Sequence, residues 1–171
     1  MTTIKLSTSQ GDLILELDAE NAPETVKNFV QYVEDGHYDG TIFHRVIGNF
    51  MIQGGGFEPG MKQKPTRDAI AHEGEKSAAG GLKNRRGSLA MARTNDPHSA
   101  SAQFFINVVD NDFLDFQAPQ GNAWGYCVFG EVREGMEVVD KIRKVKTGRN
   151  GFHDDVPLED VVIEKAEVIA A

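Results

Sequence analysis

The sequence contains one cysteine, one tryptophan and no apolar run long enough to cross a membrane. One cysteine cannot form an internal disulfide, which fits a reducing compartment. Cys127 lies in the apolar run 126–129 without an adjacent basic residue, so we expect a small core residue and not a reactive thiol. The N-terminal segment 1–12 lacks the apolar centre of a secretion signal. We therefore expect a cytoplasmic protein.

An excess of positive charge is also missing. The chain has 18 lysines and arginines against 26 acidic residues, a formal net charge of −8. The one compact basic cluster, Lys83-Asn84-Arg85-Arg86, is explained by a solvated loop. Proteins that bind nucleic-acid backbones carry a dominant basic surface. We expect neither a nucleic-acid nor a membrane partner.

Common signatures of metal, phosphate and nucleophile sites are absent. The five histidines are scattered and show no metal-ligand spacing. Gly54-Gly55-Gly56 is not followed by the Lys-Ser/Thr pair of a phosphate loop, so a backbone turn is favoured. Ser88 lacks the pattern of a nucleophile elbow. We expect no metal and no cofactor.

The organisation is that of one domain, residues 1–171, because no repeat or low-complexity linker interrupts the chain. Most of the regular structure is β-patterned, with turn residues between short apolar runs. We expect strands over residues 3–8, 13–17, 42–47, 50–53, 87–93, 103–108, 126–132 and 161–168.

Two segments have helical periodicity. The first runs from about Ala22 to Asp35, with Pro23 at a favoured first position and Gly36 as a stop. The second covers 134–145. Between them, 58–86 is polar and aperiodic, and we expect long loops there with one short strand over 69–72. After 110–112 we expect a short helical turn over 113–116. Many short strands with two isolated helices indicate a mainly β fold, a closed antiparallel barrel.

The stretch 42–53 is unusual for a core segment. Gly48-Asn49 divides it into two β-prone pieces that place an arginine, Arg45, and a glutamine, Gln53, among large apolar residues. Arginine is rarely buried unless paired, so Arg45 either directs its guanidinium at a ligand from the lip of an apolar surface or is merely solvated. Taken alone, the local pattern favours the second interpretation.

Three segments together change this balance. Phe43-His44-Arg45-Val46-Ile47-Gly48-Asn49-Phe50-Met51-Ile52-Gln53-Gly54-Gly55 is followed by 87–93 (GSLAMAR) and 101–106 (SAQFFI). In this order and spacing they resemble the signature segments of the cyclophilins, the peptidyl-prolyl cis/trans isomerases, and most closely the compact bacterial cytosolic type. The resemblance covers nearly the whole chain. It implies an eight-stranded antiparallel barrel with a helix at each end and a site on the outer face of the barrel.

The resemblance also implies roles for individual residues. Arg45, Phe50 and Gln53 are expected to be catalytic, with Arg45 donating to the prolyl nitrogen of a twisted peptide bond. The expected substrate-binding residues are Met51, Ala92, Arg93, Thr94, Gln103, Phe105, Phe113, Leu114 and Tyr126. The partners would be proline-containing peptides and unfolded or partly folded proteins, bound by a monomer that assists folding.

Some positions depart from the pattern of the best-known members. Phe113 stands where they carry a tryptophan, so the implied binding of cyclosporin should be weakened. Tyr126 replaces a histidine and Arg93 an asparagine. Two alternatives remain open: a catalytically silent module that binds proline peptides on the same fold, and a general holdase, which would need a larger exposed apolar surface.

Overall fold

The computed structural model describes all 171 residues and shows a mainly β protein with three α-helices. The helices are α1 (Pro23–Glu34), α2 (Gly74–Ala79) and α3 (Met136–Arg143), with 3-10 turns η1 (Asp112–Leu114) and η2 (Gly121–Trp124). The strands are β1 (Thr2–Thr8), β2 (Gly11–Leu17), β3 (Thr41–Ile42), β4 (Arg45–Ile47), β5 (Met51–Gly54), β6 (Phe57–Glu58), β7 (Lys62–Gln63), β8 (Ser88–Met91), β9 (Phe104–Asn107), β10 (Val128–Glu134), β11 (Thr147–Asn150), β12 (His153–Pro157) and β13 (Val162–Ala170).

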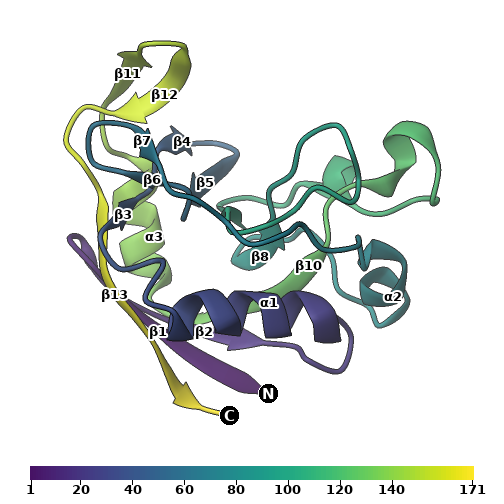
Figure 1. The fold of residues 1–171 in the computed structure, drawn as a ribbon. Helices are drawn as coiled ribbons and strands as arrows, with labels where there is room; N and C mark the ends of the chain where they lie inside the picture. Colours follow the sequence, from purple (N-terminus) through teal and green to yellow (C-terminus); the bar gives the residue numbers. More distant parts are fainter.

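One antiparallel sheet in the order β3-β13-β1-β2-β10-β8-β9-β5-β4 curls around the core (Figure 1). Its two end strands, β3 and β4, are successive parts of the segment 41–47, so this one segment pairs with β13 through Ile42 and with β5 through Val46. Counted as one strand, it gives the eight strands expected from the sequence. The mainly β, barrel-like antiparallel fold is thus confirmed.

The interior of the curled sheet is filled with side chains. Phe29 of α1 lies 5.3 Å, centroid to centroid, from both Phe104 of β9 and Phe129 of β10, and all three are fully buried. Phe105, next in sequence to Phe104, belongs to a separate small apolar cluster on the outer face, as alternation along a strand requires. A packed interior leaves the outer face as the place for a binding site.

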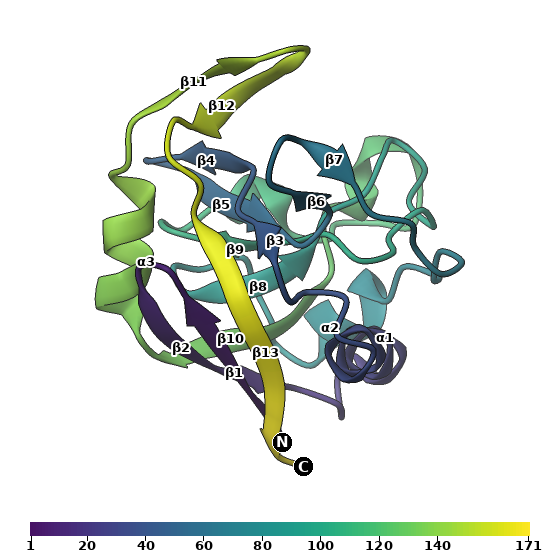
Figure 2. The same cartoon turned by 60° about the vertical axis from the view of Figure 1, so that its left-hand side comes forward.

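The helices α1 and α3 lie at opposite ends of the curled sheet (Figure 2) and pack against the same core. Pro23 occupies the first turn of α1, where its missing N–H costs nothing, and Val26, Phe29 and Val33 are buried on one face. In α3, Val138, Val139 and Ile142 are buried on the core side. Both helices lie within one or two residues of their predicted bounds.

The prediction for residues 58–86 was incomplete. The hairpin β6–β7, which begins at Phe57, and the short helix α2 lie in this part of the chain, so the protein has three α-helices and not two. The strand expected over 69–72 is reduced to one isolated bridge between Ile70 and Ala100. Helix α2 has no apolar stripe to signal it. It is attached through Ser77, whose hydroxyl donates to the carbonyl of Val128 at 2.6 Å.

A second hairpin, β11–β12, was not expected either and projects beyond the sheet (Figure 2). The strand predicted over 126–132 begins only at Val128 and continues to Glu134. Cys127, just before it, is in the hydrophobic core, and burial raises the pKa of its thiol to about 11. Its expected place in the core is confirmed. No helix has the length and apolar character needed to cross a bilayer.

Candidate functional site

A row of cross-strand partners on the outer face of the sheet builds the site. Arg45 on β4 is opposite Gln53 on β5, Gln53 is opposite Phe105 on β9, and Phe105 is opposite Ala90 on β8, which in turn faces Val128 on β10. Cross-strand partners project from the same face of a sheet. Strand pairing therefore brings Arg45 and Gln53 beside the apolar cluster of Phe105, although up to 60 residues separate them in sequence.

A cavity of about 210 Å³ opens over this row. Its lining is formed by Arg45, Phe50, Met51, Gln53, Ala92, Arg93, Phe105, Leu114 and Tyr126. These are nine of the twelve site residues expected from the sequence. The apolar floor belongs to a buried cluster that includes Met51, Phe105 and Leu114. The structure thus joins a small apolar pocket to a cationic rim.

The Arg45 guanidinium at this rim is exposed and almost unengaged. Its one hydrogen bond within the protein runs from Nη1 to Oε1 of Gln53, at a long 3.4 Å, and it forms no ion pair. A guanidinium carries five N–H donors and remains charged at all relevant pH values. Most of the donors of Arg45 are therefore free for a bound molecule.

Gln53 is oriented from its other side. Its Nε2 donates to Oε1 of Gln103 at 2.9 Å, so that a chain of polar groups runs from Arg45 through Gln53 to Gln103. Gly56 lets Gln103 approach, since a Cβ at Gly56 would lie 2.5 Å from Cγ of Gln103. The expected backbone turn in the glycine run is present at Gly55, whose φ is +92°.

Arg93 and Tyr126 form the opposite wall. The Arg93 Cζ lies 4.7 Å above the Tyr126 ring, a cation–π arrangement, while Nε and Nη2 of Arg93 donate to the carbonyl of Gly125 at 3.0 and 2.7 Å. The Tyr126 ring meets Phe105 edge-on at 5.5 Å. Nε2 of His72 lies 3.0 Å from the Gly125 carbonyl. Its Nδ1 accepts from the Gly74 N–H, so Nε2 carries the proton and donates.

The remaining three expected residues lie beside the cavity. Thr94 and Gln103 line an adjoining cavity of about 270 Å³ that shares Gln53, Ala92 and Arg93 with the first. Phe113 is 74% exposed and stacks on Phe50 with a centroid distance of 5.8 Å. It therefore lies at the outer rim and not in the lining.

A buried asparagine network under the site was not anticipated from the sequence. Asn111 Nδ2 donates to the carbonyl of Phe50 at 2.9 Å and to Oδ1 of Asn107 at 2.8 Å. Asn107 Nδ2 in turn donates to Asn84 and Ser88. The three asparagines are at most 4% exposed. Asparagine in a sequence indicates turns, and nothing in the local pattern shows that these three meet.

The histidines near the site are held neutral. Burial, with the charges of His153 and Arg45 adding to it, lowers the pKa of His44 to about 4. Burial also lowers the pKa of His72, against the opposing effect of its bond to Gly125. Groups that stay neutral around pH 7 do not supply an acid and base pair.

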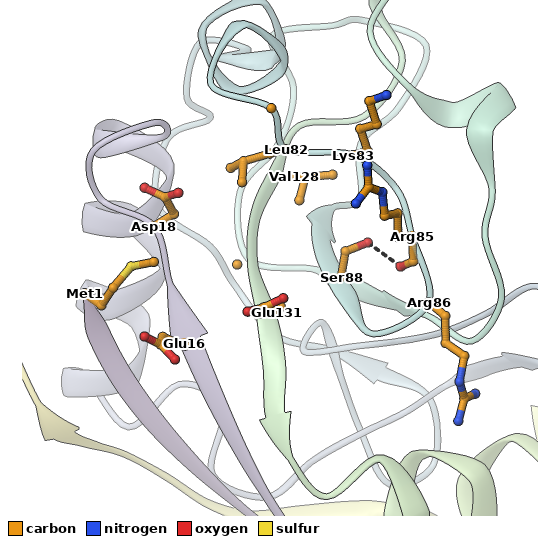
Figure 3. A pocket seen from close by; sticks show the side chains of 12 residues that line it. Met1, Glu16, Asp18, Leu82, Lys83, Arg85, Arg86, Ser88, Val128 and Glu131 are labelled. Atoms are coloured by element: carbon orange, nitrogen blue, oxygen red, sulfur yellow. Dashed lines mark hydrogen bonds between the residues drawn. The ribbon is translucent and has the colours of Figure 1, made fainter.

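A second cavity, of about 230 Å³, lies between β2, β10 and the segment before β8 (Figure 3). Glu16 and Glu131 oppose Lys83 and Arg85 across it, and Arg86 is paired with Asp140 at 2.8 Å. Of the basic cluster noted in the sequence, Arg86 is thus paired with a carboxylate, while Lys83 and Arg85 line a cavity that also contains acidic residues. The first cavity differs from this one in its mainly apolar lining and in the absence of any acidic residue beside its guanidinium groups.

The comparisons with known proteins agree with this geometry. The profile of the family "Cyclophilin type peptidyl-prolyl cis-trans isomerase/CLD" matches residues 3–168. Peptidyl-prolyl cis-trans isomerase B of Escherichia coli is 61% identical over 165 residues, 96% of this chain and 98% of that protein. Peptidyl-prolyl cis-trans isomerase cyp18 of Streptomyces antibioticus is 57% identical over 169 residues, 99% of both.

Among solved structures, a cyclophilin-type isomerase of Cryptosporidium parvum, determined in the presence of the dipeptide Ala-Pro, superimposes with a TM-score of 0.75 and 25% identity. The match covers 99% of both chains. The family profile spans nearly the whole sequence, and the bacterial relatives exceed half identity along their full length. This chain belongs to the family of cyclophilin-type peptidyl-prolyl cis-trans isomerases.

Proposed function

We propose that the cavity bounded by Arg45, Phe105 and Tyr126 catalyses rotation about X–Pro bonds, with Arg45 as the donor to the prolyl nitrogen. The observation that carries the proposal is the exposed guanidinium of Arg45, which has one weak internal hydrogen bond and stands at the mouth of a small apolar pocket. A pocket of this kind fits a proline ring, and the free donors fit an acceptor beside it.

The chemistry requires no bond to be made or broken. Rotation about an X–Pro bond faces a barrier of ~20 kcal/mol because the C–N bond has partial double-bond character. At 25 °C this barrier allows roughly one event in a hundred seconds. As the bond twists, the lone pair localises on the prolyl nitrogen, which becomes a hydrogen-bond acceptor. A donor that meets this nitrogen stabilises the twisted state more than the planar one.

Arg45 has the properties of such a donor. Its charge is fixed, and Gln53 opposite it in the β4–β5 pair directs Nη1 without consuming its capacity, since their bond is 3.4 Å long. Losing one well-placed donor to a developing charge costs about 100- to 1000-fold in rate. Enzymes lower their barriers by at least ~8 kcal/mol, so Arg45 needs help from the pocket.

The pocket supplies this help by holding the ring while the preceding carbonyl rotates. Phe50, Met51, Phe105 and Leu114 present apolar surface to the ring. The backbone N–H and C=O of Arg93 have no partner within the protein, so this one residue is free to pair with an extended peptide in a short strand-like contact. Gln103 and Thr94 border the path of the peptide in the adjoining cavity.

We propose as substrates proline-containing segments of unfolded or partly folded proteins, bound by a monomeric, single-domain cytoplasmic enzyme that assists folding. Nucleic acid is not proposed as a partner, given the net charge of −8. Cyclosporin would bind weakly, because Phe113 lacks the indole N–H that a tryptophan would offer at the rim.

The test is NMR exchange of a short Ala-Pro peptide with wild type, Arg45→Ala and, as a control, Arg85→Ala, whose arginine lines the other cavity. We expect fast exchange with wild type and the control, and a loss of about 100-fold or more with Arg45→Ala. Binding without acceleration by wild type would instead establish a silent binding module. Absence of binding would contradict the proposed site altogether.

A further inference from the structure

The charge of the groove differs from that of the protein as a whole. The two adjoining cavities over β5, β8 and β9 are lined by two arginines, Arg45 and Arg93, and by no acidic residue. The whole chain carries 26 acidic side chains and a net charge of −8. The groove is therefore a local positive region on an acidic protein.

The two charges are also uncompensated. Five of the eight arginines form ion pairs, and the three that do not are Arg45, Arg85 and Arg93. Two of the three thus lie in the groove. An arginine that needed only anchoring would be equally well held by a carboxylate, and Arg93 is held instead by neutral carbonyls of Thr94 and Gly125. Neutral acceptors fix the position of the guanidinium without cancelling its charge.

Arg93 keeps donors available as well. Its three hydrogen bonds leave two of its five N–H groups without an acceptor in the protein. It is half-buried, lines both cavities, and has its Cζ 4.7 Å from the centroid of the Tyr126 ring. A planar guanidinium immobilised in this way loses little rotamer freedom when a carboxylate arrives, which makes the contact more favourable than that of a free surface side chain.

Resting on the proposed function, we infer that the groove selects proline segments with an acidic side chain in the two residues before the proline, and that Arg93 is the specificity-determining residue. The free backbone groups of Arg93 place the peptide beside its own guanidinium, within reach of those two positions. Lysine or arginine at the same positions is disfavoured by Arg93 and Arg45 together.

The test uses blocked tetrapeptides X-Ala-Pro-Ala and Ala-X-Pro-Ala, with X as Glu, Gln or Lys. We expect kcat/KM from NMR exchange to fall in the order Glu, Gln, Lys in at least one series. The Glu-to-Lys ratio should be about tenfold at low salt. Glutamate gains a surface attraction to the arginines, and lysine in its place suffers a surface repulsion, so the two effects add in the ratio. Raising the salt to about 0.5 M should compress this ratio towards unity.

Arg93→Gln should reduce the Glu-to-Lys ratio to about twofold. The matched variant Arg85→Gln, which removes the third unpaired arginine from the cavity of Figure 3, should leave the ratio unchanged. A wild-type ratio near one, or an Arg93→Gln variant that slows all three peptides equally, would overturn the inference. If no peptide is accelerated, the proposed function fails separately, and the ratio of Kd values for the same peptides then decides the charge selectivity.

Discussion

Asn111 joins two walls of the pocket without touching it. Its Nδ2 donates to the carbonyl of Phe50 and to Oδ1 of Asn107, while its own carbonyl accepts from the N–H of Leu114 at 2.9 Å. Asn111 is 4% exposed. Asn111 therefore links the two walls, because its side chain binds Phe50 and its backbone carbonyl binds Leu114.

Replacing Asn111 by Ala removes two buried hydrogen bonds and leaves Oδ1 of Asn107 without this donor. At 0.5–1.5 kcal/mol for each bond, plus a penalty for the unsatisfied oxygen, we expect a loss of roughly 2–4 kcal/mol in the free energy of unfolding. A domain of this size remains folded after such a loss. The carbonyl of Phe50 retains only its 3.2 Å bond from the N–H of Val108, so the proline pocket should loosen.

The assay combines urea unfolding with the kinetics of an Ala-Pro peptide. We expect kcat/KM to fall about tenfold, mainly through KM, because the pocket grips the ring in both the planar and the twisted state. Asn150→Ala, at an exposed asparagine on β11, is the matched control and should change neither quantity. A destabilised Asn111→Ala enzyme with unchanged KM and kcat would refute the positioning role.

Three further predictions concern single contacts. Gly56→Ala should displace Gln103 and lower kcat/KM by the same factor as Gln103→Ala, with no further loss in the double variant. Additive losses would show that the two residues act independently and would contradict this prediction. Phe113→Trp should raise cyclosporin affinity about tenfold by calorimetry through a new N–H donor, and unchanged affinity would remove position 113 from the ligand site. His44 has a folded pKa of about 4, below its usual value, so its contribution to stability is present above pH 6.5 and is lost as the pH falls towards 4. Unfolding free energies should therefore show ~3 kcal/mol more acid sensitivity in wild type than in His44→Gln, and equal sensitivity would contradict a buried neutral ring.

The sequence predicted the regular elements where local physics determines them. In α1, Pro23 at the first turn and the stripe of Val26 and Phe29 predicted both the start and the buried face, and the structure agrees. Helix α2 was missed because six residues without an apolar stripe carry no periodic signal, and its place depends on long-range bonds of Ser77 and of the preceding Glu73. The hairpin β11–β12 contains an Asn-Gly pair at 150–151, but its flanks lack apolar alternation.

The site was predictable only through resemblance. The pattern around Arg45 alone favours a solvated strand, because the register that sets it beside Gln53 and Phe105 is long-range. The asparagine network has no sequence signal, since each residue is read locally as a turn former. Phe113 was expected among the substrate-binding residues, and the structure places it at the rim on Phe50, since Leu114 is the one residue of η1 that is buried.

The most direct test of the account asks whether Arg45 acts on the twisted state and not on binding. It compares wild type with Arg45→Gln, which keeps a polar side chain but loses the charge, by measuring kcat from NMR exchange and Kd for the same Ala-Pro peptide. We predict a fall in kcat of about 100- to 1000-fold with Kd changed by less than about threefold. A variant that loses affinity while its kcat stays at the wild-type value would contradict the central claim.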